Sequence, residues 1–342
     1  MIRSEDRIVV AGAGGFIGGH LVSRLLRDGC RDIVAVDLKD VSAWHQIHSG
    51  VNNVQGDLKD LAVCRQVTEG AAWVFNLAAD MGGMGFIESN KAACMLSVLI
   101  NTHLLMASQE NGVRRFFYAS SACVYAADRQ TAADVVPLSE VDAYPAMPED
   151  GYGWEKLFSE RMCRHFTEDF GLATRVARFH NVYGPEGTWD GGREKAPAAI
   201  SRKVATAVLT GDHRIDIWGD GEQTRSFMYI DDCVEGMLRL FDSDTTVPIN
   251  IGSSELVSIN ELVTLVERIA GVSLDRRYVL DAPKGVRGRN SDNTLIKAEL
   301  GWEPSTPLAT GMAVTHEWVH GQVRAALGSG HAGVPGAFVR AS

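Results

Sequence analysis

The stretch VVAGAGGFIGGHL, residues 9–21, decides the fold. It joins an apolar segment to an amphipathic one, with glycines at every third position of the junction. Glycine permits a tight turn, lets a pyrophosphate approach the backbone, and lets the following helix pack closely, while free N–H groups at a helix start favour an anion. The alternative is a glycine turn needed only for packing. We expect a dinucleotide to bind here, at Gly12, Gly15, Phe16, Ile17 and Gly18.

A carboxylate follows at the position that this interpretation requires. Asp37 ends the apolar run DIVAVD, nineteen residues after Gly18. A carboxylate there accepts hydrogen bonds from a ribose diol and repels a 2′-phosphate, so the sequence favours NAD over NADP. Asp57, in GDL after the third apolar run, is expected to contact the adenine.

Short apolar runs alternate with amphipathic segments over the first half of the chain. Val/Ile/Phe runs joined by helices are typical of strands buried on both faces of a parallel sheet. We therefore predict a Rossmann-type, doubly wound α/β domain over residues 1–180, with a returning segment near 225–255. Residues 181–326 are expected to form mainly a smaller substrate domain, and the glycine-rich residues 327–342 a flexible tail.

Composition excludes several classes of function. The chain has 342 residues, 45% of them hydrophobic, and a formal net charge of -10, so nothing attracts a nucleic acid over long range. We expect no membrane partner, because no apolar run approaches the roughly 20 residues of a membrane helix. Since the chain begins without an apolar signal segment, we expect a cytoplasmic location. The six cysteines are widely spaced, which indicates reduced thiols, and neither they nor the histidines form a metal-binding pattern, so we expect no metal site.

A tyrosine and a lysine stand one helical turn apart in the segment DGYGWEKLFSERMCRHF, residues 150–166. An ammonium beside a phenol lowers the phenol pKa, so Tyr152 with Lys156 is suited to accept a proton from a substrate hydroxyl while NAD takes the hydride. Ser121, at the end of another apolar run, is placed to bind the same oxygen. The same spacing also occurs on helices without any catalytic role.

A thiol follows this serine by two positions. If the strand continues, Cys123 points to the same side as Ser121. A thiolate with a pKa moved toward neutrality would serve as a base for a hydrogen next to a ketone, and Lys195 in the loop GGREKAPAA would serve from the opposite face. The alternatives are that Cys123 is a buried small hydrophobe and that Lys195 is a solvated loop charge.

The Y-x-x-x-K pair with the glycine loop resembles the short-chain dehydrogenase/reductase superfamily. The chain length and the stretches RFHNVYGP and RGRNSDNTLIKAELGW resemble its extended branch, which mostly modifies nucleotide sugars. ADMGGMGF (79–86), SSAC (120–123) and GGREKAPAA (191–199) resemble one family of that branch, the GDP-mannose 3,5-epimerases. Together with more widely shared motifs, these stretches extend from Arg7 to about Gly321.

This resemblance implies an activity and a set of residues. Tyr152 and Lys156 would assist oxidation of C4 of GDP-mannose or a related GDP-hexose, and Cys123 and Lys195 would exchange protons at C5 and C3. The expected products are GDP-L-galactose and, from inversion at C5 alone, GDP-L-gulose. The resemblance also implies a homodimer through helices near residues 90–110 and 151–170. The residues expected to line the substrate site are Gly82, Ser121, Cys123, Asn181, Glu194, Lys195, Lys203, Gln223, Arg225 and Arg289.

Some alternatives stay open from the sequence. Arg225 and Arg289 match the arginines that bind the diphosphate in the family, and a guanidinium fork suits a diphosphate. Arg287 is close enough in sequence to make the contact instead, and the alternative for each arginine is a surface ion pair. Another nucleotide-sugar epimerase, acting on C4 of a UDP-sugar or on C5 alone, would use much of the same site. A non-catalytic NAD-binding protein is disfavoured because Tyr152 and Lys156 are both present.

Overall fold

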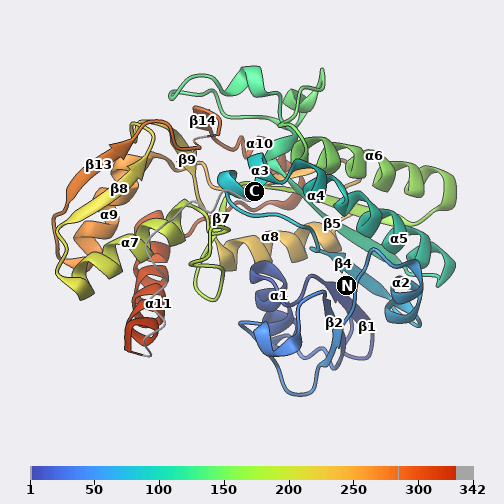
Figure 1. Ribbon diagram of the computed structural model, residues 1–342. Helices are drawn as coiled ribbons and strands as arrows, with labels where there is room; N and C mark the ends of the chain where they lie inside the picture. The colour runs from blue at the N-terminus through green and yellow to red at the C-terminus, as the bar shows by residue number, and fades with distance from the viewer. Residues whose placement is uncertain (1, 284, 329–342) are drawn as a thin grey trace.

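The computed structural model describes residues 2–283 and 285–328 and is built on one parallel sheet (Figure 1). Its strand order is β11-β6-β5-β4-β1-β2-β3, and every neighbouring pair is parallel. This order is that of a doubly wound fold and confirms the predicted fold class. The strands are β1 (Arg7–Ala11), β2 (Asp32–Asp37), β3 (Asn52–Gln55), β4 (Trp73–Asn76), β5 (Arg115–Ser121), β6 (Ala173–Phe179) and β11 (Ile249–Ile251).

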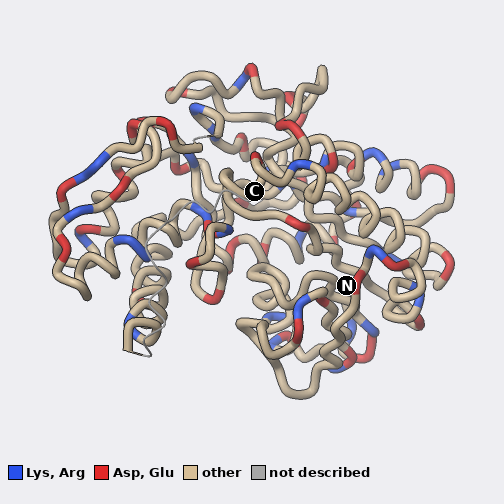
Figure 2. The backbone as a smooth tube through the Cα atoms, viewed as in Figure 1, with Lys and Arg blue, Asp and Glu red and all other residues tan. Residues whose placement is uncertain are grey.

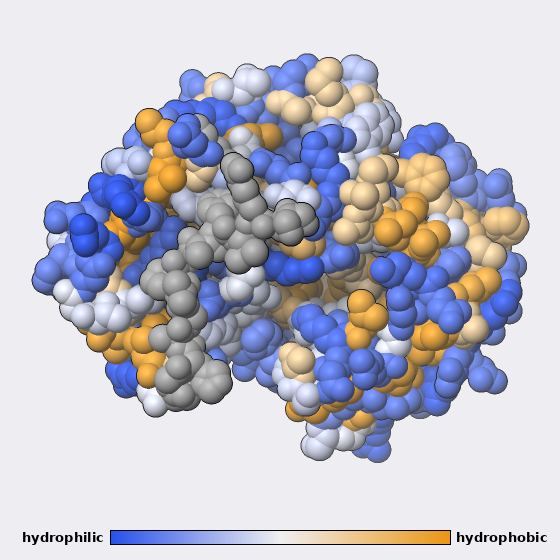
Figure 3. All heavy atoms as spheres, in the orientation of Figure 1, coloured by the Kyte–Doolittle hydropathy of each residue, from blue (hydrophilic) through white to orange (hydrophobic). Residues whose placement is uncertain are grey.

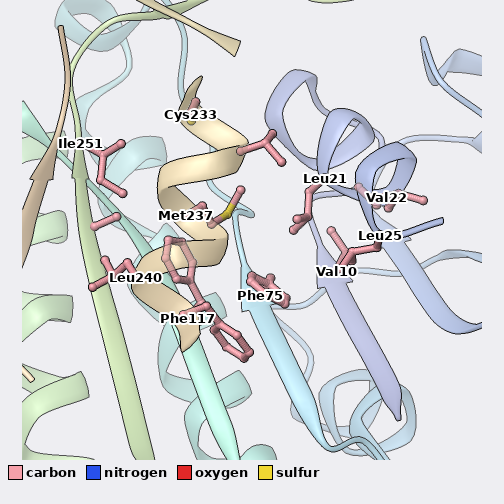
Figure 4. Packing of buried hydrophobic residues seen from close by; sticks show 14 of the residues in the cluster. Val10, Leu21, Val22, Leu25, Phe75, Phe117, Cys233, Met237, Leu240 and Ile251 are labelled. Atoms are coloured by element: carbon pink, nitrogen blue, oxygen red, sulfur yellow. The ribbon is translucent and has the colours of Figure 1, made fainter. Parts of the chain in front are cut away.

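Helices cover both faces of this sheet. One face packs against α2 (Leu61–Thr68), α5 (Ser97–Glu110) and α6 (Tyr152–Phe170), and the other against α1 (Phe16–Arg27), α8 (Ile230–Asp242) and α10 (Thr294–Leu300). Figure 4 shows Met237 and Leu240 of α8 and Leu21 and Leu25 of α1 in one packed cluster over the strands. The buried Val/Ile/Phe runs of the sequence therefore form strands because both of their faces are covered.

A second, smaller group of elements lies on the opposite side of the molecule (Figure 1). A separate buried cluster joins α7 (Ala196–Thr210) and α9 (Ile259–Ala270) to β8 (Arg214–Trp218) and α11 (Leu308–Gly328). The predicted division near residue 180 stays a prediction, although β11 returns to the large sheet as expected. Residues 329–342, most of the predicted tail, lie outside the described residues.

The remaining elements are short and form the connections. The strands are β7 (Val182–Tyr183), β9 (Thr224–Ser226), β10 (Met228–Tyr229), β12 (Leu256–Ser258), β13 (Asp275–Val279) and β14 (Gly288–Arg289). The helices are α3 (Met84–Ser89), α4 (Lys91–Met95) and the 3-10 turns η1 (Val41–Ala43), η2 (Ala122–Val124), η3 (Ala127–Gln130) and η4 (Glu140–Ala143).

One stretch within the described residues, Lys91–Glu110, has the length and hydropathy of a membrane helix. The expectation that no apolar run approaches this length was therefore wrong. Its physical reason is packing: Leu104 and Leu105 of this stretch are fully buried against α2, α6 and the sheet. An apolar helix that lies in the core layer of an α/β fold satisfies the same test as a membrane span.

The surface carries charges of both signs. Lys and Arg alternate with Asp and Glu along the chain in Figure 2, so no large region of one sign is seen in this view. The space-filling view is mostly hydrophilic and is indented at its lower edge, between the side that carries α11 and the side that carries α1 (Figure 3).

The topology determines where a ligand binds. The chain reverses its strand order between β1 and β4, and ligands of open α/β sheets bind at the carboxyl ends of strands beside such a reversal. The segments that follow β1, β4, β5 and β6 all leave the sheet at this edge, since the strands are parallel. These segments carry the glycine loop, Gly82, Cys123 and Asn181.

Candidate active site

The glycine loop is shaped for a dinucleotide. A Cβ at Gly12, whose φ is +83°, would lie 2.8 Å from the backbone N of Ala78, and a Cβ at Gly18 would lie 2.2 Å from the carbonyl oxygen of Gly12. Gly15 is the N-cap of α1, so the N–H groups of Phe16, Ile17 and Gly18 in its first turn point toward the loop. The cradle that glycine leaves open, with a helix N-terminus behind it, fits the pyrophosphate of NAD.

The two predicted carboxylates lie at the ends of neighbouring strands. Asp37 ends β2 and Asp57 follows β3, and each caps its own turn by accepting a backbone N–H two residues later, from Lys39 at 3.0 Å and Lys59 at 2.9 Å. The other carboxylate oxygen of Asp37, Oδ2, suits the ribose diol expected there. The Lys39 ammonium, which would attract a 2′-phosphate, donates instead to the carbonyl oxygen of Gly14 at 3.0 Å.

The proposed acid–base tyrosine begins α6. Tyr152 and Lys156 are both buried, and the lysine ammonium lies 5.5 Å from the centroid of the Tyr152 ring and 4.7 Å from that of Tyr118. Glu155 accompanies the lysine at 3.6 Å. The structure therefore brings the predicted tyrosine and lysine together on one helix.

The pKa of Tyr152 is shifted in the direction opposite to the prediction. Burial raises it well above its ordinary value, the negative charges of Cys123 and Glu155 add to this, and a hydrogen bond with Ser121 lowers it. Burial is the largest cause, because a phenol in the interior loses its solvation when it ionises. The contact does place Ser121 beside the phenol, as predicted.

Cys123 reaches the site by a route that the sequence did not indicate. Strand β5 ends at Ser121, and Cys123 lies in the 3-10 turn η2, so the two-residue strand period was the wrong argument. The Cys123 N–H instead donates to Ser121 Oγ at 3.2 Å, which fixes the turn. Gly153 allows this approach, because a Cβ there would lie 2.3 Å from the Cys123 carbonyl oxygen.

The expected lowering of the thiol pKa was also wrong. Burial, followed by the negative charge of Glu149, raises the pKa of Cys123 to about 11, although Arg289 and Ser121 act in the opposite direction. The thiol is 6% exposed and lies in a buried cluster with Ile87, Cys94 and Tyr152. At neutral pH it is therefore protonated, and it needs a partner that takes its proton before it acts as a base.

Lys195 is held near the Cys123 thiol by two loops whose backbones are in direct contact. The N–H of Gly83 donates to the Arg193 carbonyl oxygen at 3.0 Å, and a Cβ at Gly83 would lie 2.6 Å from the Glu194 carbonyl oxygen. Lys195 is the N-cap of α7. Burial lowers its pKa and the nearby Cys123 opposes this, so the predicted pair does lie in one site.

Two arginines and a carboxylate surround Cys123. Arg289 donates to Gln130 at 2.6 Å, to Cys123 Sγ at 3.5 Å and to Glu149, while Arg225 donates to the Thr224 carbonyl oxygen at 2.6 Å. Burial and the charge of Arg289 lower the pKa of Arg225 to about 9, which is consistent with two adjacent cations. That these arginines hold a diphosphate stays a prediction. Arg287 pairs with Asp220 at 2.8 Å.

Sequence reasoning missed Glu149 and Gln130. Both are brought to Cys123 by Arg289, which lies 159 positions from Gln130 and 140 from Glu149 in the chain. The available signal for Glu149 was its place three residues before Tyr152. An acidic residue just before a helix is also common for electrostatic reasons, so that signal was ambiguous.

The other predicted substrate residues lie around the two loops and in the smaller group of elements. Lys203 donates to the Asp216 carbonyl oxygen at 2.7 Å, and Gln223 donates to that of Trp218 at 2.8 Å while its own Oε1 is buried without a hydrogen-bond partner. Glu194 binds Arg202 at 2.7 Å. Asn181 follows β6 with a φ of 28°, and Gly82 packs against Phe86. Their contact with a substrate stays a prediction.

The described part of the chain holds no group of three or more His, Cys, Asp or Glu side chains suited to a metal ion.

The parallel sheet, the glycine loop and the Tyr152–Lys156 pair define a class of NAD-binding enzymes. Comparison with known proteins gives the same class. The chain belongs to the NAD dependent epimerase/dehydratase family, whose model matches residues 8–252. NAD is therefore its cofactor, as the sequence predicted. The chain is 49% identical over 324 residues to GDP-mannose 3,5-epimerase 1 of Oryza sativa subsp. japonica, which covers 93% of this chain and 82% of the relative. The resemblance to GDP-mannose 3,5-epimerases is thereby confirmed.

Solved structures agree with this class. The UDP-glucose 4-epimerase of Thermotoga maritima, solved with UDP-glucose, is 25% identical with a TM-score of 0.83 and covers 93% of this chain and 99% of its own. MoeE5, solved with UDP-glucose and NAD, is 30% identical with a TM-score of 0.77 and the same coverage.

Proposed function

We propose that this protein converts GDP-mannose to GDP-L-galactose by inverting C3 and C5, and releases GDP-L-gulose when only C5 is inverted. The observation that carries the proposal is the meeting of Cys123 and Lys195 beside Tyr152 in an NAD-dependent epimerase fold. A 4-epimerase needs the tyrosine and the cofactor, but it needs no thiol and lysine that act on neighbouring carbons.

Each residue of the site has its own role in the proposed reaction. Tyr152, with Ser121 and Lys156, accepts the proton of the C4 hydroxyl and later returns it. NAD, held by the glycine loop and Asp37, would supply the hydride acceptor and donor for C4. A carbonyl at C4 acidifies the hydrogens on both C3 and C5, so one pair of groups serves both carbons. Cys123 removes a proton on one face of the ring, and Lys195 delivers one on the other.

The nucleotide is expected to be held by cations within a protein of net charge -10. Arg225 is half-buried at the rim of the thiol site, and Lys203 lies 5.7 Å from the centroid of the Trp218 ring, which offers a surface for a base or sugar. We propose that these groups bind the GDP moiety.

We further propose that the protein works in the cytoplasm as a homodimer. Leu96 and Phe158 are 51% and 55% exposed on α5's N-cap and α6, beside the exposed Met95, Leu99 and Trp154. Hydrophobic residues gather over these helices in Figure 3. A second copy covering this surface would remove it from water.

All six cysteines are free thiols, which supports a reducing compartment such as the cytoplasm.

The test is to incubate the purified protein with GDP-mannose and separate the products by chromatography. GDP-L-galactose and GDP-L-gulose should form without added NAD if the cofactor is retained during purification. Formation of neither product, with conversion of UDP-glucose to UDP-galactose instead, would identify a 4-epimerase and overturn the proposal.

A further inference from the structure

Asn250 is the centre of a buried hydrogen-bond network behind the active site. It lies in β11, an edge strand of the large sheet, and is fully buried. Its side-chain Oδ1 accepts from the Tyr125 hydroxyl and from His180 Nε2, the latter at 3.1 Å. Its Nδ2 donates to the carbonyl oxygens of Leu138 at 2.8 Å and Asp292 at 3.3 Å. Both acceptor positions and both donor hydrogens of this amide are used, so its partners determine its orientation.

The protonation states of the two donors fix the direction of these bonds. Burial raises the pKa of Tyr125, so the phenol keeps its proton, donates to Asn250 and accepts from Arg178 Nη1 at 3.5 Å. Burial lowers the pKa of His180 to about 3, so its ring is neutral at pH 7. Its Nε2 carries the proton, because Oδ1 of Asn250 is an acceptor. Tyr125 and His180 therefore bind Asn250 in one pattern across the neutral pH range.

Two partners of Asn250 are close in sequence to residues of the active site. Tyr125 lies two positions after Cys123, and its backbone N–H caps the turn η2 that carries the thiol. Asp292 lies three positions after Arg289, whose guanidinium donates to the thiol. The single amide of Asn250 therefore joins the segment that carries the thiol to the segment that carries the guanidinium.

Gln130 makes a second connection between the same two segments. Its Oε1 accepts from Arg289 Nε at 2.6 Å, and its Nε2 donates to the Tyr125 carbonyl oxygen at 3.3 Å. Hydrogen bonds thus run from Arg289 through Gln130 to Tyr125. They continue through Asn250 to the backbone of the segment that carries Arg289, which closes a ring. The side chains of this ring are buried, and within it Arg289 Nη1 lies 3.5 Å from Cys123 Sγ.

We propose that the hydrogen bond between Tyr125 and Asn250 positions the Cys123 thiol against Arg289, and that proton exchange at C3 and C5 depends on it. This inference rests on the function proposed above. A closed ring of buried hydrogen bonds favours one arrangement, so loss of one bond lets the turn η2 move relative to the guanidinium. A displacement of about 1 Å is enough to slow a catalytic step by up to about 100-fold. Tyr125 and Asn250 are positioning residues, since they act on the substrate through Cys123.

The experiment compares Tyr125→Phe with Tyr183→Phe. Each change removes one buried phenol hydroxyl and keeps the ring, but the Tyr183 hydroxyl donates to the Leu308 carbonyl oxygen at 3.2 Å, in the smaller group of elements. The measurements are kcat and KM for GDP-mannose, and deuterium incorporation at C3 and C5 in heavy water. Both changes are also made in the Cys123→Ala background, and a thermal melt of each variant shows that folded protein is compared.

Loss of the Tyr125 hydroxyl should slow the chemical step and leave binding nearly unchanged. In Y125F, kcat and deuterium incorporation should fall about tenfold, while KM changes less than about threefold. Y183F should match wild type in all three quantities, with a similar loss of thermal stability. In the C123A background, where the thiol is already absent, Y125F should change the residual exchange less than about twofold, because two changes that act through one group are not additive.

A merely structural Tyr125 would give another result. Exchange by Y125F at the rate of Y183F would overturn the proposal. So would a loss of the same factor in the wild-type and C123A backgrounds, because the hydroxyl would then act on the whole site and not through Cys123. A wild-type protein that incorporates no deuterium from GDP-mannose would instead contradict the function proposed above.

Discussion

At the scale of single residues, the account depends on the thiol of Cys123. Replacing Cys123 by Ala should lower epimerisation of GDP-mannose by on the order of 10²–10⁴-fold, the usual contribution of one general acid–base group. The fold and the bound NAD should be retained, since Cys123 lies away from the glycine loop. Product formation and the NAD content of the purified protein measure the two effects.

The control for this change is Cys94→Ala. Cys94 is buried in the same cluster as Cys123 and Tyr152, whereas the side-chain hydrogen bonds described for Arg289 go to Cys123, Glu149 and Gln130. C94A should cost stability and leave most of the activity. Equal loss of activity in the two variants would mean that the cluster needs its packing and that the Cys123 thiol does no chemistry.

Lys195 sets the expected alkaline limit of activity. Its pKa lies below the ordinary value of 10.5, because burial outweighs the opposing charge of Cys123. The ammonium is the form that delivers a proton, and this form is lost as the pH rises through the lowered pKa. We expect kcat/KM for GDP-mannose to fall at a pH below 10.5. A profile that stays level through pH 10.5 would contradict the role of Lys195 as the acid.

Residue types and spacing in the sequence predicted which residues form the active site. They did not predict the direction in which the pKa values of these residues are shifted. The glycine loop, Asp37, Tyr152 and Lys156 lie where their spacing indicated, because each depends on one local turn or helix. The pKa shifts of Tyr152 and Cys123 were predicted in the wrong direction, since burial dominates both and burial depends on distant segments. Glu149 was missed because its importance appears only when Arg289 is placed beside it.

At the scale of elements, the position of Lys195 depends on the contact between two loops. The loop before α3 and the loop before α7 meet at Gly83, where a Cβ would lie 2.6 Å from the Glu194 carbonyl oxygen. Gly83→Ala should push these loops apart and displace Lys195, lowering kcat by about tenfold or more. The estimate follows from the sensitivity of catalysis to small misplacement.

A matched change lies two residues away. A Cβ at Gly85 would be no closer than 3.6 Å to any neighbour, an ordinary contact with Trp218. Gly85→Ala should therefore keep kcat near that of wild type in the same epimerase assay. If G83A were as active as G85A, the close approach of the loops would not determine the position of Lys195.

The N-terminal ends of the central strands are joined by a buried carboxylate. Burial alone would raise the pKa of Asp6, but hydrogen bonds from Arg3, Trp73 and Arg114 hold it well below its ordinary value of 3.8. A carboxylate with a lowered folded-state pKa stabilises the fold above its unfolded pKa and loses this effect as the pH falls below it.

Asp6→Asn should accordingly lower the free energy of unfolding by about 2 kcal/mol at pH 7, the typical cost of weakening hydrogen bonds to a charged group. The difference from wild type should shrink below about pH 4, where Asp6 of the wild type becomes protonated in the unfolded chain. Urea unfolding at both pH values measures this. If the difference in the free energy of unfolding between D6N and wild type is the same at both pH values, the charge of Asp6 does not contribute to stability.

The elements themselves followed from the sequence where periodicity was strong. The apolar runs became the parallel strands, and residues 152–170 became a helix, because local pattern and burial agree there. The turn at Cys123 and the membrane-like composition of Lys91–Glu110 were not predicted. Both depend on packing: Gly153 makes room for the turn, and the sheet covers the apolar helix.

At the scale of the whole molecule, the exposed apolar residues of α5 and α6 predict a dimer. Phe158→Glu should place a charge in the proposed interface and convert the protein to a monomer, because an unpaired charge is strongly disfavoured there. Light scattering after size-exclusion chromatography gives the mass. Val136→Glu is the control, since Val136 is 80% exposed on a loop elsewhere. A wild-type monomer, or F158E that remains a dimer, would contradict this interface.

The central claim is that one site inverts two carbons and leaves the carbon between them unchanged. The most direct measurement is proton NMR of the products formed from GDP-mannose in heavy water by the purified protein with NAD. We predict deuterium at C3 and C5 of the galactose-configured product and protium at C4, because the hydride returns from the cofactor while protons exchange through Cys123 and Lys195. Protium retained at C3 and C5, or inversion at C4, would contradict the account.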